Sequence, residues 1–247
     1  MSAPSSDTPP PGTPSLSSPT FSPNSAPNSA PPSSISPADY PTFFSPELPI
    51  LKGQNRLPHW DQQGRTYTIT FRLADSIPTA LKIKIQSEQK VWCADHPEPR
   101  SPALELEFHK RFTTQLELCM DEGHGACIFR QTECARLLAD TIRFHEGIRT
   151  KLYAWVIMPN HVHILTGLME PHQLPTLMES WKGYSARNLN QHLHRQGSLW
   201  QKSYHDRIIR NWDHFGNVVR YIRRNPAKAN LRSDEYLAWE SPLARLF

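Results

Sequence analysis

The sequence predicts an α+β fold, a ferredoxin-like or RRM-like sandwich. In this fold helices cover one face of an antiparallel sheet, and here an additional helix follows at the C-terminus. Segments with the two-residue alternation of strands and the 3.6-residue period of helices lead to this prediction. They follow in the order strand, helix, strand, strand, helix, strand, helix. No internal repeat is present, which excludes a repeat architecture.

The first predicted elements surround an insertion. Tyr67, Ile69 and Phe71 alternate with polar residues, as in a strand with one buried face. Residues 78–120 hold helical stretches interrupted by prolines, and we interpret them as an insertion with two helical pieces. The next helix is predicted to run from Thr132, a suitable N-cap, to Gly147, a suitable C-cap.

The rest of the chain completes the order with strands at about Leu152–Met158 and His161–Leu168, a helix ending at Gly197, and a strand over residues 198–210. The last helix is expected to begin at Asp213, a suitable N-cap. It is expected to stop at Asn225-Pro226, because proline lacks an amide proton and its ring clashes with the preceding turn.

Residues 1–50 differ in composition from the rest of the chain. They are rich in Pro, Ser and Ala and contain no Lys or Arg. Such a segment buries too little apolar surface to offset the entropy of ordering, so a disordered tail is predicted before one domain over residues 51–247. It lacks the basic start and apolar core of a signal peptide, and no apolar run reaches the roughly 20 residues of a membrane span. We therefore expect a cytoplasmic protein whose four cysteines stay reduced.

Positive charge gathers in the C-terminal part of the chain. The net charge is +4, and the tail contributes only Asp7, Asp39 and Glu47, which leaves +7 on the domain. Residues 182–232 alone carry a net +9. A stretch of this kind is typical of a polyanion partner, most simply nucleic acid, and the alternative is a solvated basic surface.

Two histidines, His161 and His163, stand one residue apart in a predicted strand. Side chains two apart on a strand share a face, so both imidazoles can reach one divalent cation such as Mn²⁺, Zn²⁺ or Mg²⁺. The alternative is a pair of half-exposed histidines without a ligand. The residues that follow do not continue the H-x-H-x-D-H pattern of metallo-β-lactamase-type hydrolases, and Leu165 replaces the third histidine of histidine-triad phosphotransferases. An amidohydrolase barrel needs a much longer chain.

The last predicted helix carries a candidate nucleophile, Tyr221. It lies on the shoulder of an apolar stripe, one turn before Asn225, so a phenol and an amide can both reach a metal held by the sheet. Arg220, Arg223 and Arg224 surround it, and we expect their charge to lower the pKa of the phenol. Tyr184 and Tyr204 are rivals for this role, and a tyrosine at the edge of the core is the structural alternative. Those three arginines are also candidates for contacts with nucleic acid.

Four stretches together resemble the single-tyrosine HUH (histidine–hydrophobic–histidine) transposases, and most closely the REP-associated tyrosine transposases of the IS200-like group. They are "YAWVIMPNHVHIL", "WKGYSARNLN", "LWQKSYHDRIIR" and "VVRYIRRNPAKANL", and the resemblance covers about residues 56–232. One departure is Asn230, where the family usually has Gly. Because Asn tolerates the left-handed backbone better than most residues, we expect the turn to be kept.

The resemblance implies a metal-dependent enzyme that nicks and rejoins single-stranded DNA beside imperfect hairpins of palindromic repeats. His161, His163 and Asn225 would bind Mg²⁺ or Mn²⁺, although related transposases often have Gln at the third position. Tyr221 would attack the scissile phosphate and form a 5′-phosphotyrosine.

Further basic and aromatic residues then gain candidate roles in DNA binding. Lys182, Arg187, Arg207 and Arg210 are expected to contact phosphates, and Trp200 or Tyr204 to stack on an unpaired base. A structural role is the alternative for each. Two other functions stay open: a DNA-hairpin-binding protein without catalysis, and an H-x-H metal hydrolase without a tyrosine intermediate. The sequence does not decide between a monomer and a homodimer.

Overall fold

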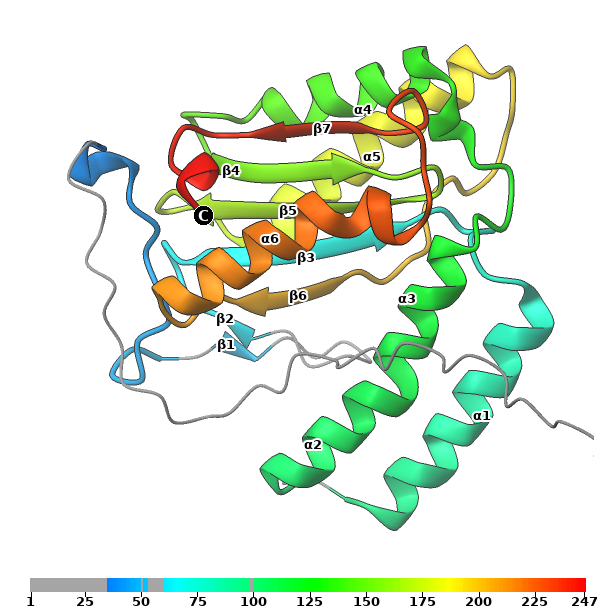
Figure 1. Cartoon of the computed structure of the whole chain (residues 1–247), viewed down its shortest axis with the longest axis horizontal. Coiled ribbons are helices and arrows are strands. Elements are labelled where there is room, and N and C mark those ends of the chain that lie inside the picture. Colours follow the sequence, from blue (N-terminus) through cyan, green and yellow to red (C-terminus); the bar gives the residue numbers. More distant parts are fainter. Residues whose placement is uncertain (1–34, 50, 53–59, 98–99) are drawn as a thin grey trace, which may run out of the picture.

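The computed structural model describes residues 35–49, 51–52, 60–97 and 100–247. Its centre is a five-stranded antiparallel sheet in the order β6-β3-β5-β4-β7 (Figure 1). The strands are β3 (Thr66–Arg72), β4 (Thr150–Ile157), β5 (His161–Leu168), β6 (His205–Ile208) and β7 (Leu237–Glu240), and a separate ladder pairs β1 (Leu51–Lys52) with β2 (Trp60–Asp61).

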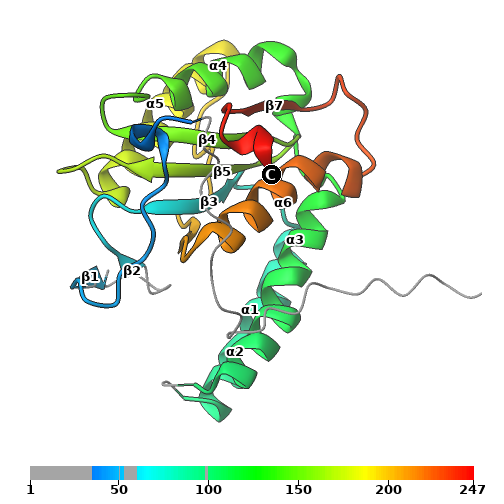
Figure 2. The same ribbon diagram turned by 60° about the vertical axis from the view of Figure 1, so that its left-hand side comes forward.

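Helices cover both faces of this sheet (Figures 1 and 2). Helices α4 (Thr132–Arg143) and α5 (Leu174–His192) lie on one face, and α6 (Trp212–Lys228) lies on the other. The strand order and the two helices on one face confirm the predicted ferredoxin-like α+β sandwich. The additional C-terminal helix of the prediction is α6, which packs on the opposite face.

The core under α4 and α5 follows from strand alternation. Tyr67, Ile69 and Phe71 point into it from β3, and Val162 and Ile164 join them from β5. All five are 1% exposed or less. Because the side-chain period of a strand is two, the intervening residues of β3 and β5 necessarily face α6.

A second, smaller core lies between α6 and that other face. Phe215, Val218, Val219 and Ile222 form the predicted helical stripe, and it packs against β4 and β5 near Leu165. Short 3₁₀ turns at η1 (Pro37–Asp39), η3 (Ile128–Arg130) and η4 (Ala244–Leu246) complete the connections.

The insertion between β3 and α4 forms a pair of helices that projects away from the sheet (Figures 1 and 2). The first is α1 (Thr79–Asp95). The second is a run of α2 (Pro102–Phe108), a π-helical turn (His109–Thr113) and α3 (Thr114–Asp121). These correspond to the two helical pieces expected from the sequence. Trp92 and Phe112 pack between them, and the end of α3 returns to the sheet.

The predicted tail differs from expectation where the structure describes it. Residues 1–34 and 50 lie outside the described part, whereas residues 35–49 contact the domain. The Gln62 side chain bonds to the backbone of Ser45 and Leu48, and the amide of Phe44 donates to the carbonyl of Ile209 at 2.9 Å. Aromatic side chains in this segment make apolar contacts with the domain; Tyr40, for example, packs edge to face against Trp212. The overall composition of residues 1–50 does not reveal these contacts.

Several predicted helix ends shift by a few residues. Gln131 and Asn211 occupy the N-cap positions expected for Thr132 and Asp213, and the Asn211 side chain accepts from the amide of His214. Pro226 does not stop α6, which continues to Lys228 because proline removes only one backbone bond in the final turn. As expected, Asn230 keeps the left-handed turn, with φ at 53°. Among the described residues, no helix combines the length and apolarity that crossing a membrane requires.

The buried His214 at the start of α6 generates a prediction about pH and stability. Burial and the charges of Arg207 and Arg210 lower its pKa from 6.5 to about 4. Between these values the unfolded chain binds a proton that the folded chain does not, so stability falls as pH decreases from 6.5 to about 4. Because His214→Asn cannot bind this proton, the free energy of unfolding of the variant is expected to fall less between pH 7 and pH 4, by up to about 3 kcal/mol.

The measurement is urea unfolding of the wild type and of His214→Asn at pH 7, 6, 5 and 4. The Asn side chain can still accept the hydrogen bond that the Arg210 amide donates to His214 Nδ1 at 3.2 Å. Equal pH slopes for the two proteins would contradict the prediction.

Candidate active site

Strand β5 holds both predicted metal-ligating histidines on the face that α6 covers. His161 lies opposite Arg72 and His163 opposite Thr70, in register with the neighbouring β3. The two rings meet edge to face with centroids 4.9 Å apart, and the residues are only 1% and 2% exposed. The sequence therefore predicted their shared face, and the helices that pack over them make the pair fully buried.

Hydrogen bonds fix the orientation of His161. Its Nδ1 lies 2.8 Å from Asn160 Oδ1, while Asn160 Nδ2 donates to the carbonyl of His124 at 3.0 Å. Since that carbonyl only accepts, the amide oxygen faces the imidazole and Nδ1 carries the proton. The lone pair of His161 then lies on Nε2, which faces the interior of the site.

Both imidazoles are neutral near pH 7. Burial lowers the pKa of His161 well below its ordinary 6.5, and the neighbouring His163 and Lys228 lower it further. Burial also lowers the pKa of His163 to about 3. His163 Nδ1 is held by Thr70 Oγ1 at 2.8 Å. Neutral, oriented imidazoles are the form in which histidine binds a metal.

Helix α6 brings the predicted tyrosine and amide to these histidines. The Tyr221 ring contacts the His163 ring edge to face, with centroids 5.2 Å apart. Asn225 is buried one turn later, and its Nδ2 donates to the backbone carbonyl of Tyr221 at 2.9 Å. Tyr184 is exposed on α5, and Tyr204 packs against the core under that helix. Of the three candidate tyrosines, Tyr221 is therefore the one that lies beside the histidines.

Two buried acceptor atoms belong to residues of this site, one on β5 and one on α6. His161 Nε2 and Asn225 Oδ1 have no hydrogen-bond partner among the residues that the structure describes. Buried polar atoms are nearly always paired, because an unpaired one costs about 1–3 kcal/mol. Their donor chemistry, an imidazole nitrogen and an amide oxygen, fits a divalent cation.

The pKa of Tyr221 corrects one expectation. We expected Arg220, Arg223 and Arg224 to lower it, whereas burial raises it well above the ordinary value of 10.0. The carboxylate of Glu117 raises it further through its charge and a hydrogen bond, and a hydrogen bond from Asn225 opposes the rise. The phenol is therefore protonated in the resting protein.

Two of the three arginines of α6 are paired away from the phenol, and the third is exposed to solvent. Arg220 donates to Asn217 Oδ1 at 2.8 Å, and Arg223 forms a two-pronged pair with Glu240 at 2.8 and 2.9 Å. Arg224 is exposed. Arg220 and Arg223 stand one and two positions from Tyr221 and project to other sides of the helix. Arg224 stands three positions away, on the neighbouring face, and because it is exposed, water screens its charge.

The other predicted DNA-binding residues are divided between the two faces. Trp200 corrects the expectation of base stacking, because it is 5% exposed, packs on Phe71 and Phe129, and donates to Ser185 Oγ. The Lys182 ammonium is held by two backbone carbonyls at 2.7 Å.

The remaining three keep some access to solvent. Arg187 is exposed on α5, on the face away from Tyr221. Arg207 is half-buried on β6 beside the site, and Arg210 is exposed just before α6.

Two carboxylates that the sequence analysis missed reach the site from α3. Glu117 is half-buried and hydrogen-bonds the Tyr221 phenol, and burial raises its pKa. Asp121, one turn later, lies 4.0 Å from His161 Nε2 through Oδ1 and 3.0 Å from Lys228 Nζ through Oδ2. Their spacing of four residues places both carboxylates on one face of a helix, and the sequence shows this. The sequence does not show that the end of this inserted helix packs beside the histidines.

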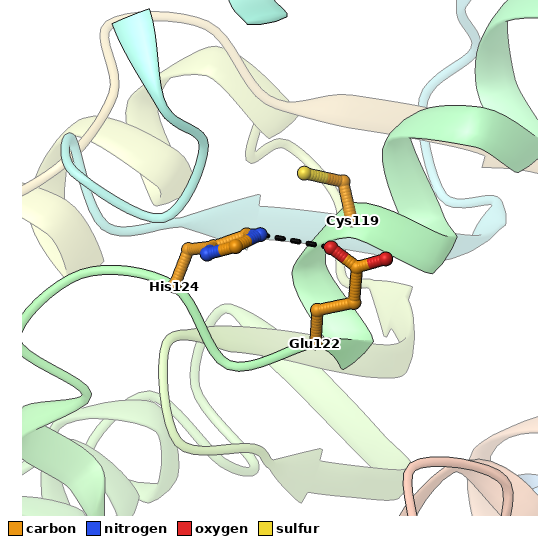
Figure 3. A group of neighbouring side chains, drawn as sticks. All are labelled: Cys119, Glu122 and His124. Atoms are coloured by element: carbon orange, nitrogen blue, oxygen red, sulfur yellow. Dashed lines mark hydrogen bonds and ion pairs between the residues drawn. The ribbon is translucent and has the colours of Figure 1, made fainter.

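A separate group of ligand-type side chains stands at the end of α3. Cys119, Glu122 and His124 place their ligand atoms within 4.8 Å of one another, and Glu122 bonds His124 Nε2 at 2.8 Å (Figure 3). Burial and the charge of Glu122 raise the pKa of the Cys119 thiol. Since the thiolate is the ligand form, a higher thiol pKa weakens metal binding by this group.

Comparison with known families agrees with this geometry. Residues 128–225 match the family model described as Transposase IS200 like. The resemblance to IS200-like transposases is confirmed. The matched segment includes both histidines, Tyr221 and Asn225, and it leaves out helices α1 to α3. The match supports a transposase-like role in DNA processing, while no curated protein matches the chain.

Two solved structures are similar to this chain at low identity. One is a REP-associated tyrosine transposase bound to a REP hairpin, with 18% identity, a TM-score of 0.41, and coverage of 71% of this chain and 74% of the other. The second is a candidate transposase from Deinococcus radiodurans R1, with 15% identity, a TM-score of 0.27, and coverage of 71% and 98%.

The surroundings of Tyr221 predict its titration. The difference in absorbance at 295 nm between wild type and Tyr221→Phe reports the ionisation of this one phenol. We expect no ionisation step near pH 10, because burial and Glu117 hold the pKa above that value. Glu117→Gln removes the nearby charge and is expected to move the step to lower pH. A step for Tyr221 at the ordinary pH in the wild type would contradict the geometry.

Proposed function

We propose that this protein is a metal-dependent transesterase that nicks and rejoins single-stranded DNA beside hairpins of palindromic repeats, in the manner of a REP-associated tyrosine transposase. The observation that carries the proposal is the contact of the Tyr221 ring with His163, beside the unpartnered His161 Nε2 and Asn225 Oδ1. This contact would bring a nucleophile on α6 to cation ligands on β5 within one buried site.

The proposed reaction uses residues of two facing elements. His161 and His163 on β5 and Asn225 on α6 would hold Mg²⁺ or Mn²⁺, and a cation bound there supplies charge that polarises the scissile phosphate. The Tyr221 oxygen attacks phosphorus, a bond from phosphorus to this oxygen forms, and the bond to the 3′-oxygen breaks. Glu117, which accepts the hydrogen bond of the phenol, takes the phenolic proton.

The products follow from this exchange of bonds. The departing 3′-oxygen takes a proton from water and becomes a 3′-hydroxyl, while the 5′ end stays on Tyr221 as a phosphotyrosine. Because one phosphodiester replaces another, a 3′-hydroxyl can attack the phosphotyrosine and rejoin the strand without ATP. On rejoining, the 3′-hydroxyl gives its proton back to water, and the departing phenolic oxygen takes back the proton that Glu117 holds.

The covalent intermediate provides the first test. Single-stranded hairpin oligonucleotides labelled on the 3′ side of the nick are incubated with Mn²⁺ or Mg²⁺, denatured, and run on a protein gel. The label is expected to travel with the wild-type protein and to be absent from Tyr221→Phe and His161→Ala. Tyr184→Phe is the matched control and should keep the adduct, since Tyr184 is exposed on the other face.

Each alternative has its own signature in this assay. Cleavage that persists in Tyr221→Phe, without a covalent adduct, would favour a metal hydrolase. Tight hairpin binding by the wild type without cleavage or adduct, across several hairpins, would favour a protein that only binds DNA.

The exposed cations near the site predict how DNA binding depends on salt. Arg224 is exposed on α6, whereas Arg187, a phosphate contact in the sequence-based prediction, is exposed on the opposite face of the sheet from Tyr221. Arg224→Ala is expected to weaken hairpin binding and to reduce the slope of log K against log salt by about 1, as for the loss of one phosphate contact. Arg187→Ala should leave the slope unchanged. Equal effects of the two variants in fluorescence anisotropy would contradict this placement of the DNA.

A further inference from the structure

The inserted helix α3 delivers a carboxylate to the proposed cation site. Asp121 is the last residue of α3, and its side chain is 11% exposed. Figures 1 and 2 both show the end of α3 beside the C-terminal half of α6. The residue stands outside the segment that matches the transposase family model, so the family match says nothing about it.

Packing holds the end of α3 in this place. Cys119 and Met120 are buried against Ile77, with Leu81 and Leu116 around them. The loop after α3 is tied to the sheet, because Asn160 Nδ2 donates to the carbonyl of His124, and Asn160 also orients His161. Asp121 is therefore fixed relative to the histidines by contacts on both sides.

The two oxygens of Asp121 have different neighbours. Oδ2 lies 3.0 Å from Lys228 Nζ, whereas Oδ1 lies 4.0 Å from the unpartnered His161 Nε2. A nitrogen and an oxygen that bind one octahedral cation at about 2.1 Å stand about 3.0 Å apart when they are adjacent and about 4.2 Å apart when they are opposite. The observed 4.0 Å is close to the separation of opposite ligands.

The charge of the site also calls for an anion. An imidazole binds a metal in its neutral form and an amide is uncharged, so His161, His163 and Asn225 bring no negative charge, whereas Mg²⁺ and Mn²⁺ prefer anionic oxygen. A cavity of about 170 Å³ lies against Asp121 and His161, which gives a small cation and water access from this side.

We propose that Asp121 Oδ1 is a ligand of the same divalent cation as His161 and His163, with Lys228 holding the other carboxylate oxygen. This inference rests on the proposed function, because it needs a cation at the histidine pair. It adds a fourth protein ligand, contributed by the insertion, and leaves two octahedral positions for a phosphate oxygen and water.

The test measures metal binding without DNA or turnover. Mn²⁺ is titrated into the full-length protein, and the free ion is followed by electron paramagnetic resonance. Asp121→Asn keeps the shape of the side chain and is expected to weaken Mn²⁺ binding at least about tenfold, as the loss of groups around metal sites commonly does. Asp121→Glu keeps the charge and should retain more affinity than Asn. Thermal unfolding without metal verifies that each variant is folded.

Three further variants make the result specific. Glu122→Gln makes the same change of charge on the next residue, within the group of Figure 3, and should leave Mn²⁺ binding unchanged. Lys228→Met breaks the ion pair but keeps the carboxylate, and is expected to maintain or tighten binding. His161→Ala should abolish it.

The outcomes separate the two proposals. If His161→Ala loses Mn²⁺ while Asp121→Asn binds like the wild type, Asp121 is not a ligand and the inference fails alone. Equal weakening by Asp121→Asn and Lys228→Met would also overturn it, because Asp121 would then act only through the ion pair. If His161→Ala binds like the wild type, the cation site of the proposed function fails, and the inference fails with it.

Discussion

The packing of α6 across the sheet is the interaction on which the rest of the site depends. Phe215, Val218, Val219 and Ile222 bury against β4 and β5, and each such side chain contributes about 1.5–3 kcal/mol on burial. This apolar contact fixes the rotation of the helix and therefore the direction of Tyr221, which lies next to the stripe. Without it the phenol and the His163 imidazole have no reason to meet, since they are far apart in sequence.

That same packing removes the polar groups of the site from water, which disfavours their charged forms. Burial keeps both imidazoles neutral, raises the pKa of Tyr221, and leaves His161 Nε2 and Asn225 Oδ1 without partners among the described residues. Neutral imidazoles and unpartnered acceptor atoms favour the binding of a cation at this site. The carboxylates of Glu117 and Asp121, brought by α3, supply negative charge beside Tyr221 and His161.

Much of the fold and part of the site could be predicted from the sequence, because they depend on local periodicity. Alternation in β3 and β5 predicted which residues enter the core and placed His161 and His163 on one face. The helical stripe likewise predicted the orientation of α6. Contacts between distant elements could not be predicted in this way. The burial of Trp200, the directions of the arginines near Tyr221, and the arrival of Asp121 all depend on how an inserted or distant segment packs.

The short edge strands of the sheet limit how two copies of the protein can associate. Strands β6 and β7 are each four residues long, whereas the central strands have seven or eight. An edge this short exposes few unpaired amide and carbonyl groups, so it is a weak template for a foreign strand. The sheet is thereby protected against edge-to-edge aggregation, and self-association would have to use helical or loop surfaces instead.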